Sequence, residues 1–297
     1  MNNAINEVWR CGDYIVRVHP RGGATRLQRE AALLRDLRAG TRAPEPIAAG
    51  PAPWGEWMVT KRLPGQELSR AWGRLRVDER HRAITELALA LKVLHAVPAP
   101  LDGPAGDPDE CPHALPIDVL VGLLAKAAAL PGVDRGVMAA AADRLATVAD
   151  ALDDQPTTLI HGDLHPENVL VGEDGRLTGV IDFEWARAGP PDLDLDILLH
   201  SLADPSLHVE SGDGSRLQRR DFDEVAGWMR DAYPELFSHP RLSDRLWVYR
   251  LAYEVHALVT QGPGRAATGA SFPPHHPYQR IVRLVGDRSD LGWFLTR

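Results

Sequence analysis

The chain has 297 residues, 44% of them hydrophobic and 25% charged, which is typical of a globular protein with one large or two ordinary domains. Its formal net charge of −8 argues against nucleic acid or an anionic membrane as the main partner. Two cysteines without CxxC spacing argue against a disulfide scaffold and a zinc ribbon. The start MNNAINEVW lacks the features of a signal peptide, and no run reaches the roughly 18 apolar residues of a membrane span. We therefore expect a protein of the reducing cytoplasm, without a membrane partner.

The first sixty residues predict a small sheet that carries one helix. EVWRCGDYIVRV (7–18) predicts a hairpin that turns at Gly12 and Asp13. ATRLQREAALLRDLRAG has apolar residues at helical spacing, which predicts a helix over 24–39. After a Pro-rich turn, WGEWMVTKRL predicts a strand that ends before Pro64.

The rest of the chain predicts helices around one hairpin. NVLVGEDGRLTGVIDF predicts a hairpin that turns at 173–175, whereas 98–116 and 262–277 are too rich in Pro and Gly for regular structure. Helices are predicted over 78–97, 117–130, 133–152, 192–203, 221–233, 241–261 and 278–286. A small β-rich lobe to about residue 62 and a larger helical lobe after it give an α+β fold with a cleft between the lobes.

LIHGDLHPENVLV (159–171) places several polar side chains between two apolar runs. His161, Asp163 and Asn168 form the pattern H-x-D-x-x-x-x-N, and Asp182 follows an apolar strand nineteen residues after Asp163. The intervening hairpin would bring Asp182 back beside Asn168. Phosphoryl transfer from a nucleotide requires a carboxylate for the proton of the attacking hydroxyl and oxygen ligands for Mg²⁺. The segment supplies both.

Two other interpretations use the same segment. His161, Asp163, His165 and Asp182 are ligand types that a zinc or iron hydrolase would use, although the nearest later histidine, His200, lies in an apolar helix. The second is a polar turn without chemistry. The chain has neither GxxxxGK[ST] nor GxGxxG, so a nucleotide would be bound without these motifs.

HGDLHPEN followed by VIDFEWARAGPPDLDLDILL resembles the aminoglycoside phosphotransferase family, small-molecule relatives of the protein kinases. Gly162 replaces the arginine of the kinase loop, and Glu184 stands at the glycine of the D-F-G motif. The resemblance implies a protein-kinase-like two-lobe fold. Residues 1–62 would form the nucleotide-binding lobe, and residues 63–297 a helical lobe with the catalytic loop 159–185 and the acceptor-binding helices.

The resemblance also assigns roles in the loop. It implies Asp163 as the catalytic base and Asn168 and Asp182 as the Mg²⁺ ligands. His161 would brace the loop, His165 would be peripheral, and Asp194 would anchor the loop by hydrogen bonds. For Asp194 the alternative is an acid at a helix start that interacts with the helix dipole.

Glu30 lies on the apolar stripe of the helix predicted over 24–39. A carboxylate buried without a partner costs several kcal/mol, so Glu30 requires a cation, and Arg17 in the strand YIVRV supplies one. By the resemblance this pair replaces the kinase Lys–Glu pair that holds the phosphates, with an arginine that stays charged and binds phosphate bidentately. A surface arginine such as Arg26 is the alternative partner of Glu30.

WMVTKRL resembles the segment between the lobes. Backbone groups from Lys61 to Leu63 would contact the nucleotide base, and Thr60 would line the pocket. Only MNNAINE precedes the first hairpin, so the family's first strand is expected to be missing or abbreviated, with residues 2–6 as the loop over the phosphates.

The acceptor is expected to be a hydroxylated small molecule held after residue 195. Glu184 would face a cationic acceptor or solvent. Glu254 is a second candidate contact, although the helical stripe that contains it is more often core. Acids and arginines are nearly balanced in this region, so composition does not favour a polycation, and an aminoglycoside or other antibiotic comes from the resemblance alone.

The main hypothesis is a phosphotransferase that uses ATP or GTP with Mg²⁺ and acts as a monomer or homodimer on a small-molecule hydroxyl. One alternative is a catalytically inactive, kinase-like protein that binds a ligand in the cleft. The other is a metal-dependent hydrolase.

Overall fold

The computed structural model describes residues 6–20, 25–37, 39–98, 112–153, 157–205, 217–262, 272–288 and 290–295. The expected phosphate loop, apart from Asn6, lies outside these ranges, as does most of the two predicted Pro/Gly loops. In the part that the structure describes, no helix is long and apolar enough to cross a membrane.

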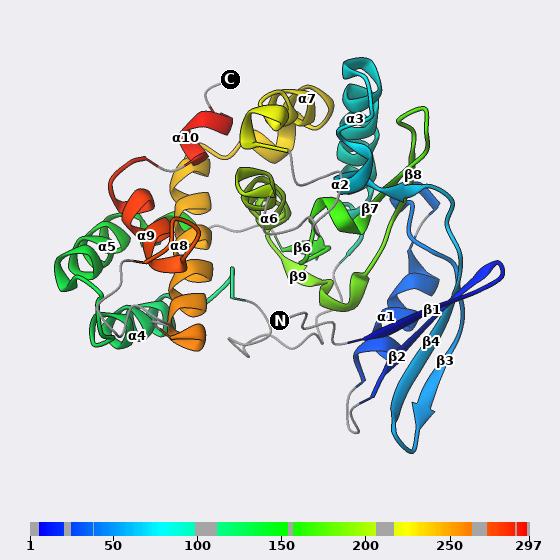
Figure 1. Ribbon diagram of the computed structural model, residues 1–297, viewed down its shortest axis with the longest axis horizontal. Coiled ribbons are helices and arrows are strands. Elements are labelled where there is room, and N and C mark those ends of the chain that lie inside the picture. Colours follow the sequence, from blue (N-terminus) through cyan, green and yellow to red (C-terminus); the bar gives the residue numbers. More distant parts are fainter. Residues whose placement is uncertain are drawn as a thin grey trace.

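A four-stranded antiparallel sheet forms one end of the molecule (Figure 1), with the strand order β1-β2-β4-β3. The strands are β1 (Glu7–Cys11), β2 (Tyr14–His19), β3 (Pro46–Ala52) and β4 (Gly55–Lys61). The predicted hairpin is β1 and β2, and β2 pairs with β4 with Arg17 opposite Met58. The prediction of a turn over β3 was wrong. An edge strand accommodates Pro46 and Pro51 because the edge position does not require every N–H.

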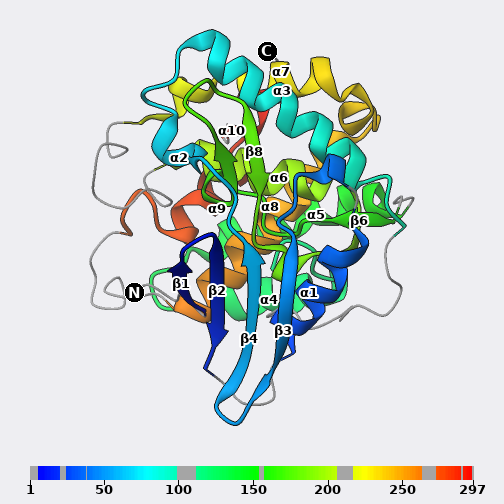
Figure 2. The same ribbon diagram turned by 90° about the vertical axis from the view of Figure 1, so that its right-hand side faces the viewer.

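Helix α1 (Arg26–Asp36) packs against β3 and β4 of this sheet (Figure 2). The helix buries Leu27, Glu30, Ala31 and Leu34. The side chain of its N-cap residue, Thr25, makes no capping hydrogen bond. Instead, the buried Glu56 of β4 accepts hydrogen bonds from the N–H groups of Leu27 (3.1 Å) and Gln28 (3.2 Å). A carboxylate at a helix N-terminus satisfies free N–H groups and interacts favourably with the helix dipole. Glu56 therefore fixes the start of α1 to the sheet.

The larger part of the molecule is mainly helical, and the predicted α+β class is confirmed. Its helices are α2 (Leu68–Ala71), α3 (Val77–Leu94), α4 (Ile117–Ala128), α5 (Arg135–Val148), α6 (Asp192–Ala203), α7 (Val225–Ala232), α8 (Leu242–Gln261), α9 (Pro277–Val285) and α10 (Asp290–Leu295). Its strands are β5 (Gln66–Glu67), β6 (Thr158–Ile160), β7 (Val169–Val171), β8 (Leu177–Val180) and β9 (Arg187–Gly189). The elements absent from the sequence prediction, α2, α10, β5 and β9, are all too short to show a period.

Helix α6 runs through the middle of the helical part, beside the longer α8 (Figure 1). Every residue of α6 from Asp192 to Leu202 is buried. Asp192 forms an ion pair with Arg245 of α8, and Asp196 lies 3.0 Å from Arg250 of the same helix. Buried charges need such partners, so these pairs hold α6 and α8 in register.

The contact between Glu56 and α1 generates a stability prediction. Glu56→Ala leaves the buried N–H of Leu27 and the partly buried N–H of Gln28 without acceptors, and a buried group of this kind costs about 1–3 kcal/mol. We expect the variant to lose a comparable amount of unfolding free energy in urea titrations. Glu45→Ala, which removes an exposed partner of Lys61, should change it by less than about 1 kcal/mol. Equal losses in the two variants would contradict the capping role.

Candidate active site

The segment 159–168 is held by a carboxylate from another element. Asp194 of α6 is fully buried and accepts hydrogen bonds from the backbone N–H groups of His161 (2.8 Å) and Gly162 (2.9 Å). Its Oδ2 also lies 3.1 Å from Nε2 of His95, the residue that follows α3. Burial opposes the charge of Asp194, but His95 and the backbone donors hold the pKa of this carboxyl below its usual value. The structure thus places Asp194 as an anchor for the loop.

Both ring nitrogens of His161 are used inside the fold. Nε2 donates to the carbonyl oxygen of Ile181 (2.9 Å), which leaves Nδ1 to accept from the N–H of Asp163 (3.3 Å). Gly162, where the kinase loop has arginine, has φ of 80°, and a Cβ there would overlap the carbonyl oxygen of Trp185. Only glycine fits this position without strain.

Asn168 and Asp182 are brought together by the β7–β8 hairpin. The N–H of Ile181 donates to the carbonyl oxygen of Asn168 (2.9 Å), so Asp182 follows directly on this contact. Asp182 has the left-handed conformation, with φ of 67° and ψ of 62°. Non-glycine residues are rarely found there, and such strain is often concentrated at functional sites.

These two residues fit a magnesium ion by their donor atoms. The amide nitrogen of Asn168 donates to the carbonyl oxygen of Asp163 (2.9 Å), and its Oδ1 makes no hydrogen bond to the described residues. The Asp182 side chain remains 34% exposed. An amide oxygen and a carboxylate are the hard ligands that Mg²⁺ prefers.

Arg17 of β2 joins the sheet to this loop. Its Nη1 contacts both carboxylate oxygens of Glu30 (2.9 and 2.7 Å), and its Nη2 contacts Asp182 (2.6 Å) and Glu184 (2.9 Å). Glu30 also accepts from the N–H of Phe183 (3.0 Å). Burial and the neighbouring carboxylates raise the pKa of Glu30 although Arg17 opposes this. The alternative partner of Glu30, Arg26, instead lies over the ring of Trp185, 4.2 Å from its centroid.

The Glu184 side chain does not face solvent, contrary to one of the two expectations, and its contact with a cationic acceptor stays a prediction. Its side chain is 6% exposed and contacts Arg17, and it accepts a hydrogen bond of 2.5 Å from Asn6. Burial and Asp182 raise the pKa of its carboxyl. The burial of Glu184 against Arg17 was not predictable because the partners of a side chain after a tight turn depend on chain folding that local sequence does not encode.

A cavity of about 240 Å³ lies between the sheet and the helical part. The five residues expected at the nucleotide line it: Arg17, Glu30, Thr60, Lys61 and Leu63. Of the two expected magnesium ligands, Asp182 lines it and Asn168 does not. Apolar side chains that the sequence analysis did not single out complete the wall: Val8, Ile15, Met58, Leu170 and Ile181. The cavity is therefore apolar along most of its length and charged where Arg17 meets Asp182.

The segment at the edge of this cavity has few free backbone donors. The N–H of Lys61 donates to Glu45 and that of Arg62 to Asp13, whereas that of Leu63 makes no hydrogen bond to the described residues. The Lys61 ammonium lies 2.6 Å from the carboxylate of Glu45, at the surface. In this segment, the backbone N–H of Leu63 is therefore the donor that could bind a planar ligand such as an aromatic ring with an acceptor atom.

His165 is not peripheral, contrary to expectation. Its Nε2 lies 3.4 Å from Asp163 and its Nδ1 3.2 Å from Glu167. Burial lowers the pKa of His165, but these two carboxylates outweigh it and raise the pKa to about 10. The Asn168 amide nitrogen, 3.1 Å from Nε2, favours the neutral ring, yet one neutral donor is weaker than two carboxylates. His165 in turn holds the pKa of Asp163 below its usual value, although burial opposes this.

The hydrolase interpretation does not fit this geometry. Both nitrogens of His161 are engaged by the backbone, so neither is open to a metal. Among the described residues, the histidines that come together as possible ligands are His113 and His200, with Asp196, and Asp196 is already paired with Arg250. A cluster of His161, Asp163, His165 and Asp182 is not formed.

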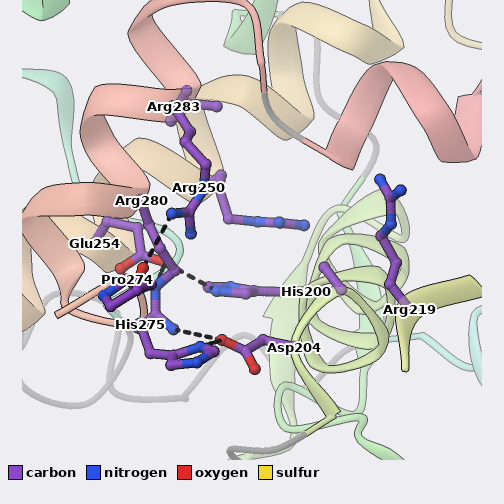
Figure 3. Close-up of a pocket in the computed structure, with 11 residues that line it drawn as sticks. His200, Asp204, Arg219, Arg250, Glu254, Pro274, His275, Arg280 and Arg283 are labelled. Carbon is purple, nitrogen blue, oxygen red and sulfur yellow. Dashed lines mark hydrogen bonds and ion pairs between the residues drawn. The ribbon is translucent and has the colours of Figure 1, made fainter. Parts of the chain in front are cut away.

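Glu254, the second candidate for acceptor contact, is fully buried on α8 and lines another cavity, of about 280 Å³ (Figure 3). Its Oε1 lies 2.7 Å from Nε of Arg280 and 2.9 Å from Nε2 of His200. Burial raises the pKa of Glu254, whereas Arg280 lowers it, and burial prevails.

Comparisons with known proteins give the family and the fold. The model of the phosphotransferase enzyme family matches residues 2–236. A curated relative, the uncharacterized protein YcbJ of Bacillus subtilis (strain 168), is 45% identical over 38 residues, which are 13% of this chain and 12% of that protein's length.

Solved structures share the fold over nearly the whole chain. The GDP complex of aminoglycoside 2'-phosphotransferase-IIIa aligns with a TM-score of 0.62 and 18% identity, covering 97% of this chain and 90% of that one. The streptomycin–ATP complex of APH(2")-IIa aligns with a TM-score of 0.59 and 16% identity, covering 99% and 92%. APH(4)-Ia with ADP and hygromycin B aligns with a TM-score of 0.56 and 16% identity, covering 95% and 94%. The protein-kinase-like fold expected from the sequence is confirmed.

The anchor at Asp194 generates a prediction with a defined pH dependence. Because the folded-state pKa of Asp194 is depressed, its charge stabilises the fold above the unfolded-state pKa of about 3.9, and this contribution is lost as the pH falls below that value. Asp194→Asn should lower the unfolding free energy at pH 7 by about 1.5–3 kcal/mol, the size of hydrogen bonds to a charged group. In urea titrations, the difference in unfolding free energy between Asp194→Asn and the wild type should shrink between pH 5 and pH 3. This range covers about one unit on either side of the unfolded-state pKa.

Asp174→Asn, in the exposed β7–β8 turn, provides the matched control and should leave stability nearly unchanged. A difference for Asp194→Asn that stayed constant down to pH 3 would show that the charge of Asp194 does not support the loop.

Proposed function

We propose that this chain, which belongs to the phosphotransferase enzyme family, transfers the γ-phosphoryl group of ATP or GTP to a hydroxyl of a small molecule. The observation that carries the proposal is that Asn168 joins Asp163 to Asp182: its amide donates to the carbonyl oxygen of Asp163, its own carbonyl oxygen accepts from the N–H of Ile181, and Asp182, the next residue, lines the 240 Å³ cavity. The nucleotides named with the structural neighbours, GDP, ADP and ATP, were bound by those proteins and support a nucleotide donor here.

The two parts of the chain would have different roles in the reaction. Residues 1–62 would bind the nucleotide, with its base in the apolar part of the cavity, at Thr60 and Leu63, and its phosphates toward Arg17. Residues 63–297 would supply the catalytic loop and the acceptor site. The pairing of Arg17 with Glu30 would orient the guanidinium, and Arg17 binds a phosphate more rigidly than lysine does because its donors form a planar fork.

Asp163 would act as the base. The acceptor oxygen attacks the γ-phosphorus, the bond from that phosphorus to the β–γ bridging oxygen breaks, and the hydroxyl proton passes to the Asp163 carboxylate. The side chain of Asp163 is 38% exposed and therefore accessible to an acceptor. Its lowered pKa keeps it ionised at neutral pH.

Asn168 and Asp182 would hold Mg²⁺, which when bound neutralises charge on the phosphate oxygens. His161 would keep the loop in place through Ile181, and Asp194 would do so through two backbone N–H groups. Glu184 would align Arg17 with Asp182, since it contacts the same Nη2 as Asp182 does.

The base assignment is tested by Asp163→Asn. The substitution keeps the size of the side chain but removes the proton acceptor, so kcat for ADP release should fall by on the order of 10²–10⁴-fold. Asp174→Asn is the control and should keep wild-type turnover. Unchanged turnover in a folded Asp163→Asn protein would rule out Asp163 as the base.

The nucleotide site is tested by thermal shift with Mg-ATP. A ligand at 100 times its Kd stabilises the native state by about 2.7 kcal/mol, so the wild-type Tm should rise. Asp182→Asn should lose most of the part of the shift that depends on Mg²⁺. An equal Mg²⁺-dependent shift in that variant would contradict Asp182 as a ligand.

The same data separate the alternatives. A shift without ADP release from any acceptor would favour the inactive ligand-binding protein. No shift, together with stoichiometric zinc or iron by elemental analysis, would favour the hydrolase.

A further inference from the structure

The cavity of about 280 Å³ beside Glu254 lies among α6, α8 and α9 and is separate from the nucleotide-side cavity (Figure 3). Arginines predominate among its charged side chains: Arg219, Arg250, Arg280 and Arg283. Arg250 extends into the hollow toward Arg219 (Figure 3). Two carboxylates, Asp204 and Glu254, share this lining.

Both carboxylates already contact cationic or ring nitrogens. Glu254 lies against Arg280 and His200, as described above, and Asp204 lies 2.7 Å from Nδ1 of His275 and 3.8 Å from Arg280. Burial holds the pKa of His200 well below its usual value, so this ring adds no positive charge. An incoming ammonium group would have to displace these contacts.

Arg283 differs from the paired arginines of the cavity. Arg250 pairs with Asp196 and Arg280 with Glu254, but Arg283 contacts the carbonyl oxygen of Pro274 (3.0 Å) and no carboxylate among the described residues. Guanidinium groups gathered in a partly buried space repel one another, and a bound anion removes that repulsion. Arginine is also the side chain best suited to bind carboxylate or phosphate bidentately.

The cavity begins near the catalytic loop. Asp194, which anchors that loop, and His200, which lines the cavity, are six residues apart on α6, or about 9 Å at 1.5 Å per residue. His113 stacks on Tyr253 with ring centroids 4.3 Å apart, and its ring centroid lies 6.0 Å from that of His200. Burial opposes the lowered pKa of Asp163 and His165 is the main cause of it, but His113 also contributes, so His113 connects the surroundings of the cavity with those of Asp163.

We propose that this cavity binds an anionic group of the acceptor, a carboxylate or a phosphate, while the acceptor's hydroxyl lies at Asp163. The inference rests on the proposed phosphotransferase function and narrows its substrate class to hydroxylated acids roughly as long as one or two helical turns. An aminoglycoside, which carries several ammonium groups, would instead meet the arginines of the cavity.

Binding is tested with inorganic phosphate by isothermal titration calorimetry. We expect saturable binding that Arg283→Gln weakens by about 10–100-fold, the loss of charge-assisted hydrogen bonds. Arg241→Gln removes the same charge from the start of α8, at a surface ion pair with Asp150, and should bind as the wild type does. Saturable binding that Arg283→Gln leaves unchanged would mean that phosphate binds elsewhere, for example near Arg17, and would overturn the anion site. No saturable binding, or equal weakening in both variants, would overturn the anion site.

Turnover is tested with acceptors in matched pairs: sugar acids against their parent sugars, and nucleoside monophosphates against nucleosides, with aminoglycosides as the cationic set. The anionic member of a pair should be preferred, and Arg283→Gln should raise its KM with little change in kcat. Comparing the sugar acids with the nucleoside monophosphates shows whether the cavity binds a carboxylate or a phosphate.

Faster turnover of the neutral or cationic members would overturn the inference and leave the phosphotransferase function standing. No ADP release from any acceptor, without a Mg-ATP shift, would remove that function, and the phosphate titration would still decide whether the cavity binds anions.

Discussion

The position of the sheet relative to the loop 159–185 depends on one buried cation, Arg17. Arg17 is 10% exposed, and its guanidinium contacts Glu30 from α1 together with Asp182 and Glu184 from the helical part. Removing one of these partners would leave buried charge uncompensated and lower the unfolding free energy, so sheet, helix and loop are stabilised together. Glu56 belongs to the same arrangement, because by capping α1 it fixes where Glu30 meets Arg17.

Helix α6 gives the loop a second support, and its sequence shows why the helix must be central. Asp192, Asp194 and Asp196 are two residues apart, so successive side chains point about 200° away from one another around the axis. A surface helix would expose at least one of them. Here Asp192 and Asp196, which are four residues apart and share one side of α6, pair with Arg245 and Arg250 of α8, whereas Asp194 meets the backbone of the loop 159–168 on the opposite side. Three acids in an apolar helix are thus evidence for complete enclosure.

The features that were predictable from the sequence are those in which a few adjacent residues determine the outcome. The hairpin that returns Asp182 to Asn168 and the need of Glu30 for a cation both follow from spacing and burial within short segments. The edge strand β3 was missed because its proline-containing sequence has a low β-propensity. It forms a strand because it pairs with β4 in the folded protein. The cap from Glu56 and the arginine-lined cavity were missed because they join elements far apart in the chain, and nothing near Arg283 in the sequence indicates Arg250.

The local distribution of charge says more about which ligands the site can bind than the net charge of −8 does. At the nucleotide end three carboxylates share one arginine, which favours a metal cation there. At the other end arginines outnumber carboxylates. A nucleotide phosphate and an anionic acceptor would repel each other by about 2 kcal/mol per pair of unit charges 10 Å apart at an effective dielectric constant of 20. Arginines around the acceptor's anion offset that repulsion where it arises, so a negatively charged acceptor is compatible with a site that also binds a nucleotide.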